Sequence, residues 1–122
     1  MPVKTVLVVD DSPTERHVLV EMLTSAGYTV ITAESGEEGI EKAKAELPDL
    51  VLMDVVMPGL NGYQATAAIR SLPGEKGELP IVAMTANAFA EDVQLAKNTG
   101  MNGHIAKPLD MNKLSDVLKK WL

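Results

Sequence analysis

The sequence predicts an α/β fold: a doubly wound parallel sheet with helices on both faces. Five short apolar runs alternate with five longer segments of helical periodicity, which is typical of sheets built from βα units. The runs are rich in β-branched residues, as strands are. The expected strands are Thr5–Val9, Tyr28–Thr32, Leu50–Met53, Ile81–Met84 and His104–Ala106.

The first and fourth of these runs predict central strands, because they are apolar on both faces. The second run, YTVIT, alternates between apolar and polar residues, which favours an edge strand or one that is covered on one face only. The sheet is therefore expected to have a buried centre and a more exposed margin.

Each expected helix begins at a capping residue. Ser12 to Glu15 (SPTE) matches a capping box with proline at the first helical position, and an apolar stripe follows from Val18 to Ala26 before Gly27. Ser35 to Glu38 (SGEE) is a second capping box. The remaining helices are expected to open at Asn61 and run to about Leu72, to open at Asn87 or a neighbour and end near Gly100, and to open at Asp110.

The bulk properties predict one cytoplasmic domain spanning residues 1–122. A net charge of -6 and a pI of about 4.8 argue against nucleic acid or an anionic membrane as a partner. The absence of cysteine excludes disulfides and thiolate metal sites. No apolar run approaches the ~20 residues of a membrane span, and the N-terminus does not match a secretory signal.

Polar side chains follow four of the five expected strands. Asp10 and Asp11 follow the first, Asp54 the third, Thr85 the fourth and Lys107 the fifth. In such sheets, function gathers at the carboxyl ends of the strands. Two carboxylates 4 Å apart repel each other by about 4 kcal/mol at an effective dielectric constant of 20, so clustered acids at this edge would require a cation.

The residue types at this edge favour magnesium and phosphoryl transfer. An all-oxygen site suits Mg²⁺, with Asp54, a nearby backbone carbonyl and one of Asp10 and Asp11 as ligands, and the other acid bound through water. Asp54 could attack phosphorus and form an acyl phosphate. Lys107 would pair with one phosphoryl oxygen, and the Thr85 hydroxyl would donate to another.

Four segments resemble the signatures of receiver domains from two-component response regulators: VLVVDDSP, LVLMDVVMPGLNGYQA, IVAMTANA and GHIAKPLD. The resemblance covers essentially the whole chain, and each segment falls at its expected strand end. The first half is similar to stand-alone receivers of chemotaxis and motility systems, and the second half to receivers of hybrid sensor kinases. The resemblance implies a flavodoxin-like sheet of order 2-1-3-4-5 with five helices.

The resemblance also implies roles for individual residues. Asp54 would accept phosphate from a phosphohistidine, in a reaction that depends on Mg²⁺ bound by Asp10, Asp11, Asp54 and the backbone carbonyl of Val56. Asp11 is the expected direct ligand of the pair Asp10 and Asp11. The site would also include Thr85 and Lys107, which match the phosphate-sensing hydroxyl and lysine of the family.

The implied protein is a signalling switch rather than an enzyme. Its partners would be a sensor histidine kinase or phosphotransfer domain and a downstream protein that binds the face of the fourth helix, fifth strand and fifth helix. No nucleic acid or membrane is expected, and the protein would be a monomer or weak dimer. His104 lies where receivers often carry a switching Tyr or Phe; it is either a strand histidine with a satisfied ring or a pH-sensitive switch residue.

Two other functions remain open at this point. A haloacid-dehalogenase-type magnesium phosphohydrolase also uses a strand-end aspartate, but its DxDx[TV] pattern differs from DDSPT. The chain could also be an inert receiver that serves only for docking, although the complete set of site residues argues against this. Taken singly, Asp10 and Asp11 could form a turn and cap, Thr85 could be a strand-end threonine, and Lys107 a surface lysine.

Overall fold

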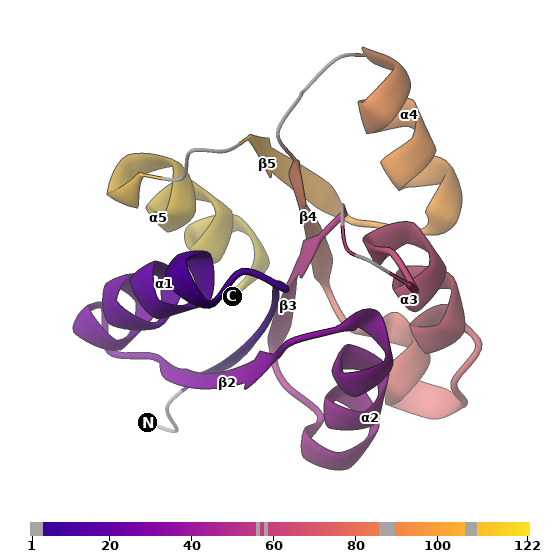
Figure 1. The fold of residues 1–122 in the computed structure, drawn as a ribbon, viewed down its shortest axis with the longest axis horizontal. Coiled ribbons are helices and arrows are strands. Elements are labelled where there is room, and N and C mark those ends of the chain that lie inside the picture. The colour runs from indigo at the N-terminus through magenta and orange to yellow at the C-terminus, as the bar shows by residue number, and fades with distance from the viewer. Residues whose placement is uncertain (1–3, 56, 58, 86–89, 107–109) are drawn as a thin grey trace.

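The computed structural model describes residues 4–55, 57, 59–85, 90–106 and 110–122, and it shows a five-stranded parallel sheet (Figure 1). The strand order is β2-β1-β3-β4-β5, as the receiver resemblance implies. In chain order the elements are β1 (Thr5–Val9), α1 (Pro13–Ser25), β2 (Thr29–Ala33), α2 (Gly36–Glu46), β3 (Leu50–Asp54), α3 (Gly62–Arg70), the 3₁₀ helix η1 (Gly74–Glu78), β4 (Ile81–Thr85), α4 (Ala90–Thr99), β5 (Gly103–Ala106) and α5 (Met111–Trp121).

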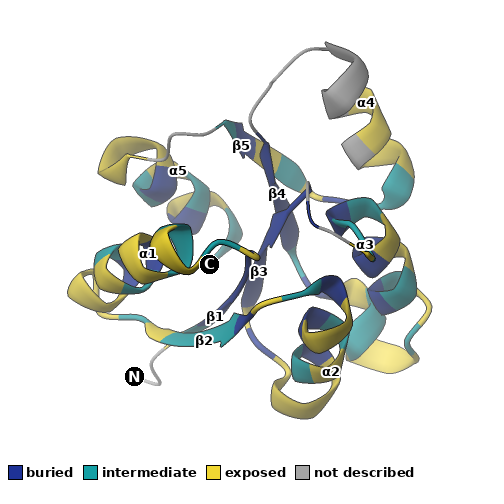
Figure 2. Ribbon diagram, in the orientation of Figure 1, coloured by how far each residue is buried: buried dark blue, intermediate teal, exposed yellow. Residues whose placement is uncertain are grey.

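Helices cover both faces of the sheet, with α1 and α5 on one face and α2, α3 and α4 on the other (Figure 1). Alternation along β1 divides its side chains between two cores. Val6 and Val8 pack with Leu19 and Leu23 of α1, and the residues of opposite phase pack with α2 and α3. Figure 2 shows buried strands enclosed by helices whose outer faces are exposed. Within the described part of the chain, no helix is long and apolar enough to cross a bilayer.

The predicted strands are confirmed, with boundaries that shift by one residue. The predicted second strand begins at Tyr28, but the Tyr28 amide donates to the carbonyl of Leu23 in the C-terminal turn of α1, so β2 begins at Thr29. Asp54 and Thr85, expected just beyond their strands, form the last residues of β3 and β4. The edge strand β2 is only partly buried, whereas β3 and β4 are buried throughout.

The helix starts follow the predicted caps, but one hydrogen bond of each of the first two predicted capping boxes has a different partner. Ser12 accepts from the Glu15 amide, but its own amide donates to Asp10 Oδ1 at 2.9 Å, where a capping box would use the Glu15 side chain. Glu38 Oε1 accepts from the Glu34 amide, one residue before the Ser35 cap. A complete capping box is found at the start of α3, between residues 61 and 64.

The later helices also follow the predictions closely. Arg70 ends α3, two residues before the predicted end. The 3₁₀ helix η1, which the sequence analysis did not predict, follows in the connection to β4. The described part of α4 ends at Thr99, beside the predicted Gly100, while its expected opening near Asn87 lies outside the described residues. Asp110 caps α5 through the Lys113 amide.

Candidate functional site

Asp10 and Asp54 meet at the carboxyl edge of the sheet because β1 and β3 are neighbours. Val8 pairs with Leu52, so the next residues of the same phase, Asp10 and Asp54, follow on the same face of adjacent strands. Asp10 is fully buried and Asp54 is 5% exposed. Two carboxylates at nearly complete burial are costly unless other groups compensate their charge, which is the first sign that this edge is a functional site.

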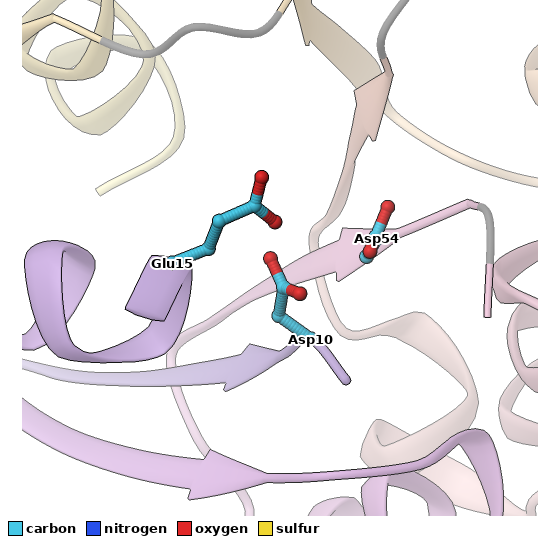
Figure 3. Close-up of side chains that lie close together, drawn as sticks. All are labelled: Asp10, Glu15 and Asp54. Atoms are coloured by element: carbon cyan, nitrogen blue, oxygen red, sulfur yellow. The ribbon is translucent and has the colours of Figure 1, made fainter. Parts of the chain in front are cut away.

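Glu15 brings a third carboxylate to the same place. Its side chain extends from the first turn of α1 toward Asp10 and Asp54 (Figure 3). Carboxylate oxygens of Asp10, Glu15 and Asp54 all lie within 4.8 Å of one another. Three oxygen donors at this spacing form a cluster that could hold a cation.

The backbone around Asp10 holds its carboxylate in place. The Asp10 amide donates to Ala33 O at 3.1 Å and extends the ladder with β2 beyond the end of β1. Asp10 Oδ1 accepts from the Ser12 amide, and the Asp10 carbonyl accepts from Arg16 Nη1 at 2.7 Å. Arg16 Nη2 also forms an ion pair with Glu34 at 3.3 Å. The loop between β1 and α1 is thus fixed from both sides.

The other predicted site residues have varied positions. Asp11 is exposed and is not part of the three-acid cluster found among the described residues. Thr85 is 6% exposed at the end of β4, which pairs with β3. His104 is exposed on the edge strand β5. Val56 and Lys107 lie outside the described residues, so their contacts stay predictions.

The donor chemistry of the cluster fits a hard divalent cation. The three side chains offer carboxylate oxygens alone, and such ligands suit magnesium better than zinc or copper. Because Asp10 and Asp54 are both buried, a cation bound between them would be little screened by water. The cluster therefore has both the ligand type and the negative charge that a magnesium site needs.

Glu15 is a member of the site that the sequence motifs did not predict, although the pattern contains a signal for it. Leu19 and Leu23 form the buried face of α1, and Glu15 lies one turn earlier on the same face, at i−4 from Leu19. The capping-box interpretation assigned its carboxylate to the Ser12 amide instead. An acid in line with a buried apolar stripe, at the end of the helix nearest the strand ends, was the available signal.

Gly62 lets α3 approach the end of β3 closely. A Cβ atom at Gly62 would meet the carbonyl oxygen of Asp54, and the Gly62 amide donates to the Val55 carbonyl at 3.3 Å. Glycine is the residue without a Cβ, so the first turn of α3 can pack directly against the backbone beside Asp54. The start of α3 is thereby held close to the site.

Comparison with known proteins identifies a consistent set of relatives. The model of the response regulator receiver domain family matches residues 6–119. Protein PilH of Pseudomonas aeruginosa is 41% identical over 117 residues, covering 96% of each chain. Sensor protein GacS of Pseudomonas syringae is 40% identical over 118 residues, which are 95% of this chain and 13% of that protein. The chain thus spans nearly all of one relative and about an eighth of the other.

Solved structures show the same fold. Chemotaxis protein CheY4 of Vibrio cholerae superposes with a TM-score of 0.92 at 32% identity, covering 99% of this chain and 100% of that chain. The receiver domain of the sensor histidine kinase PA1611 from Pseudomonas aeruginosa has a TM-score of 0.88 at 36% identity, covering 98% of each chain. That structure has a magnesium ion coordinated in its active site cleft.

Proposed function

The chain belongs to the response regulator receiver domain family, and from this membership we propose that Asp54 is its phosphoacceptor. A carboxylate oxygen of Asp54 would attack the phosphorus of a phosphohistidine. A P–O bond forms, the P–N bond to the donor imidazole breaks, and the imidazole leaves with the electron pair of that bond. The observation that carries this proposal is the position of Asp54, which lies nearly buried at the end of a central strand beside Asp10 and Glu15.

A magnesium ion is the cofactor that the site supports. The ligands would come from Asp10 and Asp54, with Asp11 and the backbone carbonyl of Val56 completing the set that the family resemblance implies. The charge of the cation would offset the charge of the transferring phosphoryl group. The contribution of the chain is to fix Asp10 through Ser12 and Arg16, so that its carboxylate is held in position before the cation binds.

Thr85 and Lys107 are proposed to read the phosphorylated state. The Thr85 hydroxyl would donate to one phosphoryl oxygen, and the Lys107 ammonium would pair with another. These contacts would bias a two-state equilibrium of the loops after β3 and β4 and change the face formed by α4, β5 and α5. His104 lies exposed on β5 within that face, and it is proposed as the switch candidate.

The proposed role is that of a regulator, with partners rather than a turnover substrate. A sensor histidine kinase or a phosphotransfer domain would supply the phosphoryl group, and a downstream protein would bind the α4–β5–α5 face. We propose a monomer or weak dimer that acts in the cytoplasm. The family match gives no support to a haloacid-dehalogenase-type phosphohydrolase.

Intact mass spectrometry tests the phosphoacceptor directly. The protein is incubated with acetyl phosphate and Mg²⁺, and wild type is compared with Asp54→Ala and with Asp116→Ala, an exposed acid on α5 that serves as the matched control. We expect one added phosphoryl group on wild type and on Asp116→Ala, and none on Asp54→Ala. Labelling of Asp54→Ala to the same extent as wild type would disprove the assignment, and absence of labelling on wild type would favour a docking module.

A further inference from the structure

We propose that Glu15 is a further residue of the phosphoacceptor site, where its carboxylate strengthens the binding of a divalent cation. The inference rests on the proposed function of Asp54, because it starts from the cation site of that function. Glu15 lies two residues beyond the segment VLVVDDSP that carries the family resemblance, so the motif itself gives it no role. The role of Glu15 is inferred from its position in the fold, beside Asp10 and Asp54.

The helical phase of α1 directs Glu15 to the site. Leu19 and Leu23 are 3% and 0% exposed, and their packing against β1 and β3 fixes the rotation of the helix. Glu15 precedes Leu19 by four residues and therefore lies on the same face of α1, at the end nearest the strand ends. Its neighbours Thr14 and His17 lie on other faces and are exposed. The packing of α1 thus places Glu15 at the solvent-exposed edge of the site, beside the buried Asp10 and Asp54.

The start of α1 also leaves the Glu15 carboxylate directed toward the site. The Glu15 amide donates to Ser12 Oγ at 3.3 Å, and the Ser12 amide donates to Asp10 rather than being capped by the Glu15 side chain. One loop thus positions two acids together: Asp10 by its hydrogen bond to Ser12, and Glu15 by the N-cap. Both carboxylates reach the space beside Asp54 (Figure 3).

The electrostatic consequence is a stronger field for a cation than two aspartates alone would give. Each carboxylate within 4.8 Å of the others adds attraction for a divalent ion and repulsion toward the other acids. Removing the charge of Glu15 should therefore weaken the binding of a divalent cation. A direct contact and a contact through water would both have this effect.

The test uses Glu15→Gln, which keeps the size of the side chain and removes its charge. The matched control is Glu41→Gln, which makes the same change of net charge at an exposed position on α2. Isothermal titration calorimetry with MgCl₂ measures the dissociation constant. We expect it to rise about tenfold in Glu15→Gln, at the lower end of what loss of a supporting group around a metal costs, and to stay within about twofold of wild type in Glu41→Gln.

A second measurement checks that the variants remain folded. Thermal unfolding in EDTA should show that Glu15→Gln and Glu41→Gln both unfold cooperatively, so that a difference in magnesium affinity between them reflects the site and not a loss of structure. Magnesium affinity unchanged in Glu15→Gln, or weakened equally in both variants, would overturn the proposal. If wild type neither binds Mg²⁺ nor becomes labelled at Asp54, the proposed function fails. If wild type binds Mg²⁺ and is labelled at Asp54, but Glu15→Gln binds Mg²⁺ as tightly as wild type, only the role of Glu15 fails.

Discussion

The guanidinium of Arg16 donates a hydrogen bond of 2.7 Å from Nη1 to the backbone carbonyl of Asp10. The Arg16 side chain is 14% exposed, and its Nη2 also lies 3.3 Å from Glu34, beyond the end of β2. Arg16 therefore connects α1, the loop after β1 and the end of β2. Arg16 thus helps to hold Asp10 in position, although its side chain does not belong to the cluster of carboxylates.

Replacing Arg16 by Met should loosen the loop that carries Asp10. The variant loses a charge-assisted hydrogen bond to a fully buried residue, and we expect a loss of about 1–3 kcal/mol in the free energy of unfolding. Magnesium affinity should fall as well, because Asp10 is less firmly positioned. Urea denaturation and calorimetry measure the two effects.

Glu34→Gln separates the two contacts of Arg16. The Glu34 side chain is 74% exposed, and exposed ion pairs contribute only about 0–1 kcal/mol, so this variant should change little. If Glu34→Gln destabilises as much as Arg16→Met, the ion pair would be the important contact and the hydrogen bond to Asp10 would be secondary.

Asp10→Asn should raise the stability of the metal-free protein and weaken magnesium binding. The asparagine keeps an oxygen to accept from the Ser12 amide and removes one of three clustered charges, which we expect to stabilise the protein by roughly 1–2 kcal/mol in EDTA. Thermal unfolding with EDTA and with MgCl₂ measures both effects.

Asp11→Asn is the natural comparison for Asp10→Asn. Because Asp11 is exposed and outside the cluster, its replacement should change metal-free stability by less than about 0.5 kcal/mol. A drop in the melting temperature of Asp10→Asn in EDTA would show that the acids are not mutually strained.

Arg70→Met should destabilise the opposite end of the sheet. Arg70 donates to the carbonyls of Gly77, Leu79 and Gly100 and to Asn102 Oδ1, at distances from 2.8 to 3.0 Å. Burial lowers the pKa of its guanidinium, a cost that the four acceptors offset. We expect a loss of about 2–4 kcal/mol in urea denaturation, because these acceptors lose their donor.

Asn102→Asp provides a control for Arg70. Asn102 Oδ1 also accepts from the Ile81 amide at 2.8 Å, so an aspartate would keep an acceptor for this amide and add a charge beside the guanidinium. This variant should be as stable as wild type or more stable. A loss as large as that of Arg70→Met would mean that the neutral amide, and not its oxygen acceptor, is required.

Leu47→Gly should stabilise the protein. Leu47 is the C-cap residue of α2 and has a φ of 44°, in the left-handed region. Leu47 is also 41% exposed. Glycine adopts this conformation without the steric cost of a Cβ, so we expect a gain of about 0.5–1 kcal/mol. A lower denaturation midpoint in urea would indicate that the buried part of the leucine side chain outweighs the relieved strain.

Local sequence patterns determined the elements and the fold class. The apolar run from Thr5 to Val9 and the caps at Ser12, Ser35 and Asp110 are properties of neighbouring residues, and the structure confirms them. The same patterns placed Asp54 and Thr85 at strand ends. Such signals are readable because strand alternation and helix capping depend on residues only a few positions apart.

Contacts between distant segments were decided by the tertiary structure alone. The three carbonyls that Arg70 reaches belong to the loops and the 3₁₀ helix around β4, and nothing near Arg70 in the sequence indicates them. The direction of Glu15 depended on whether its carboxylate capped the Ser12 amide or followed the buried face of α1. Local propensity allowed both conformations. In the folded protein the Ser12 amide donates to Asp10, and the Glu15 carboxylate lies beside Asp10 and Asp54.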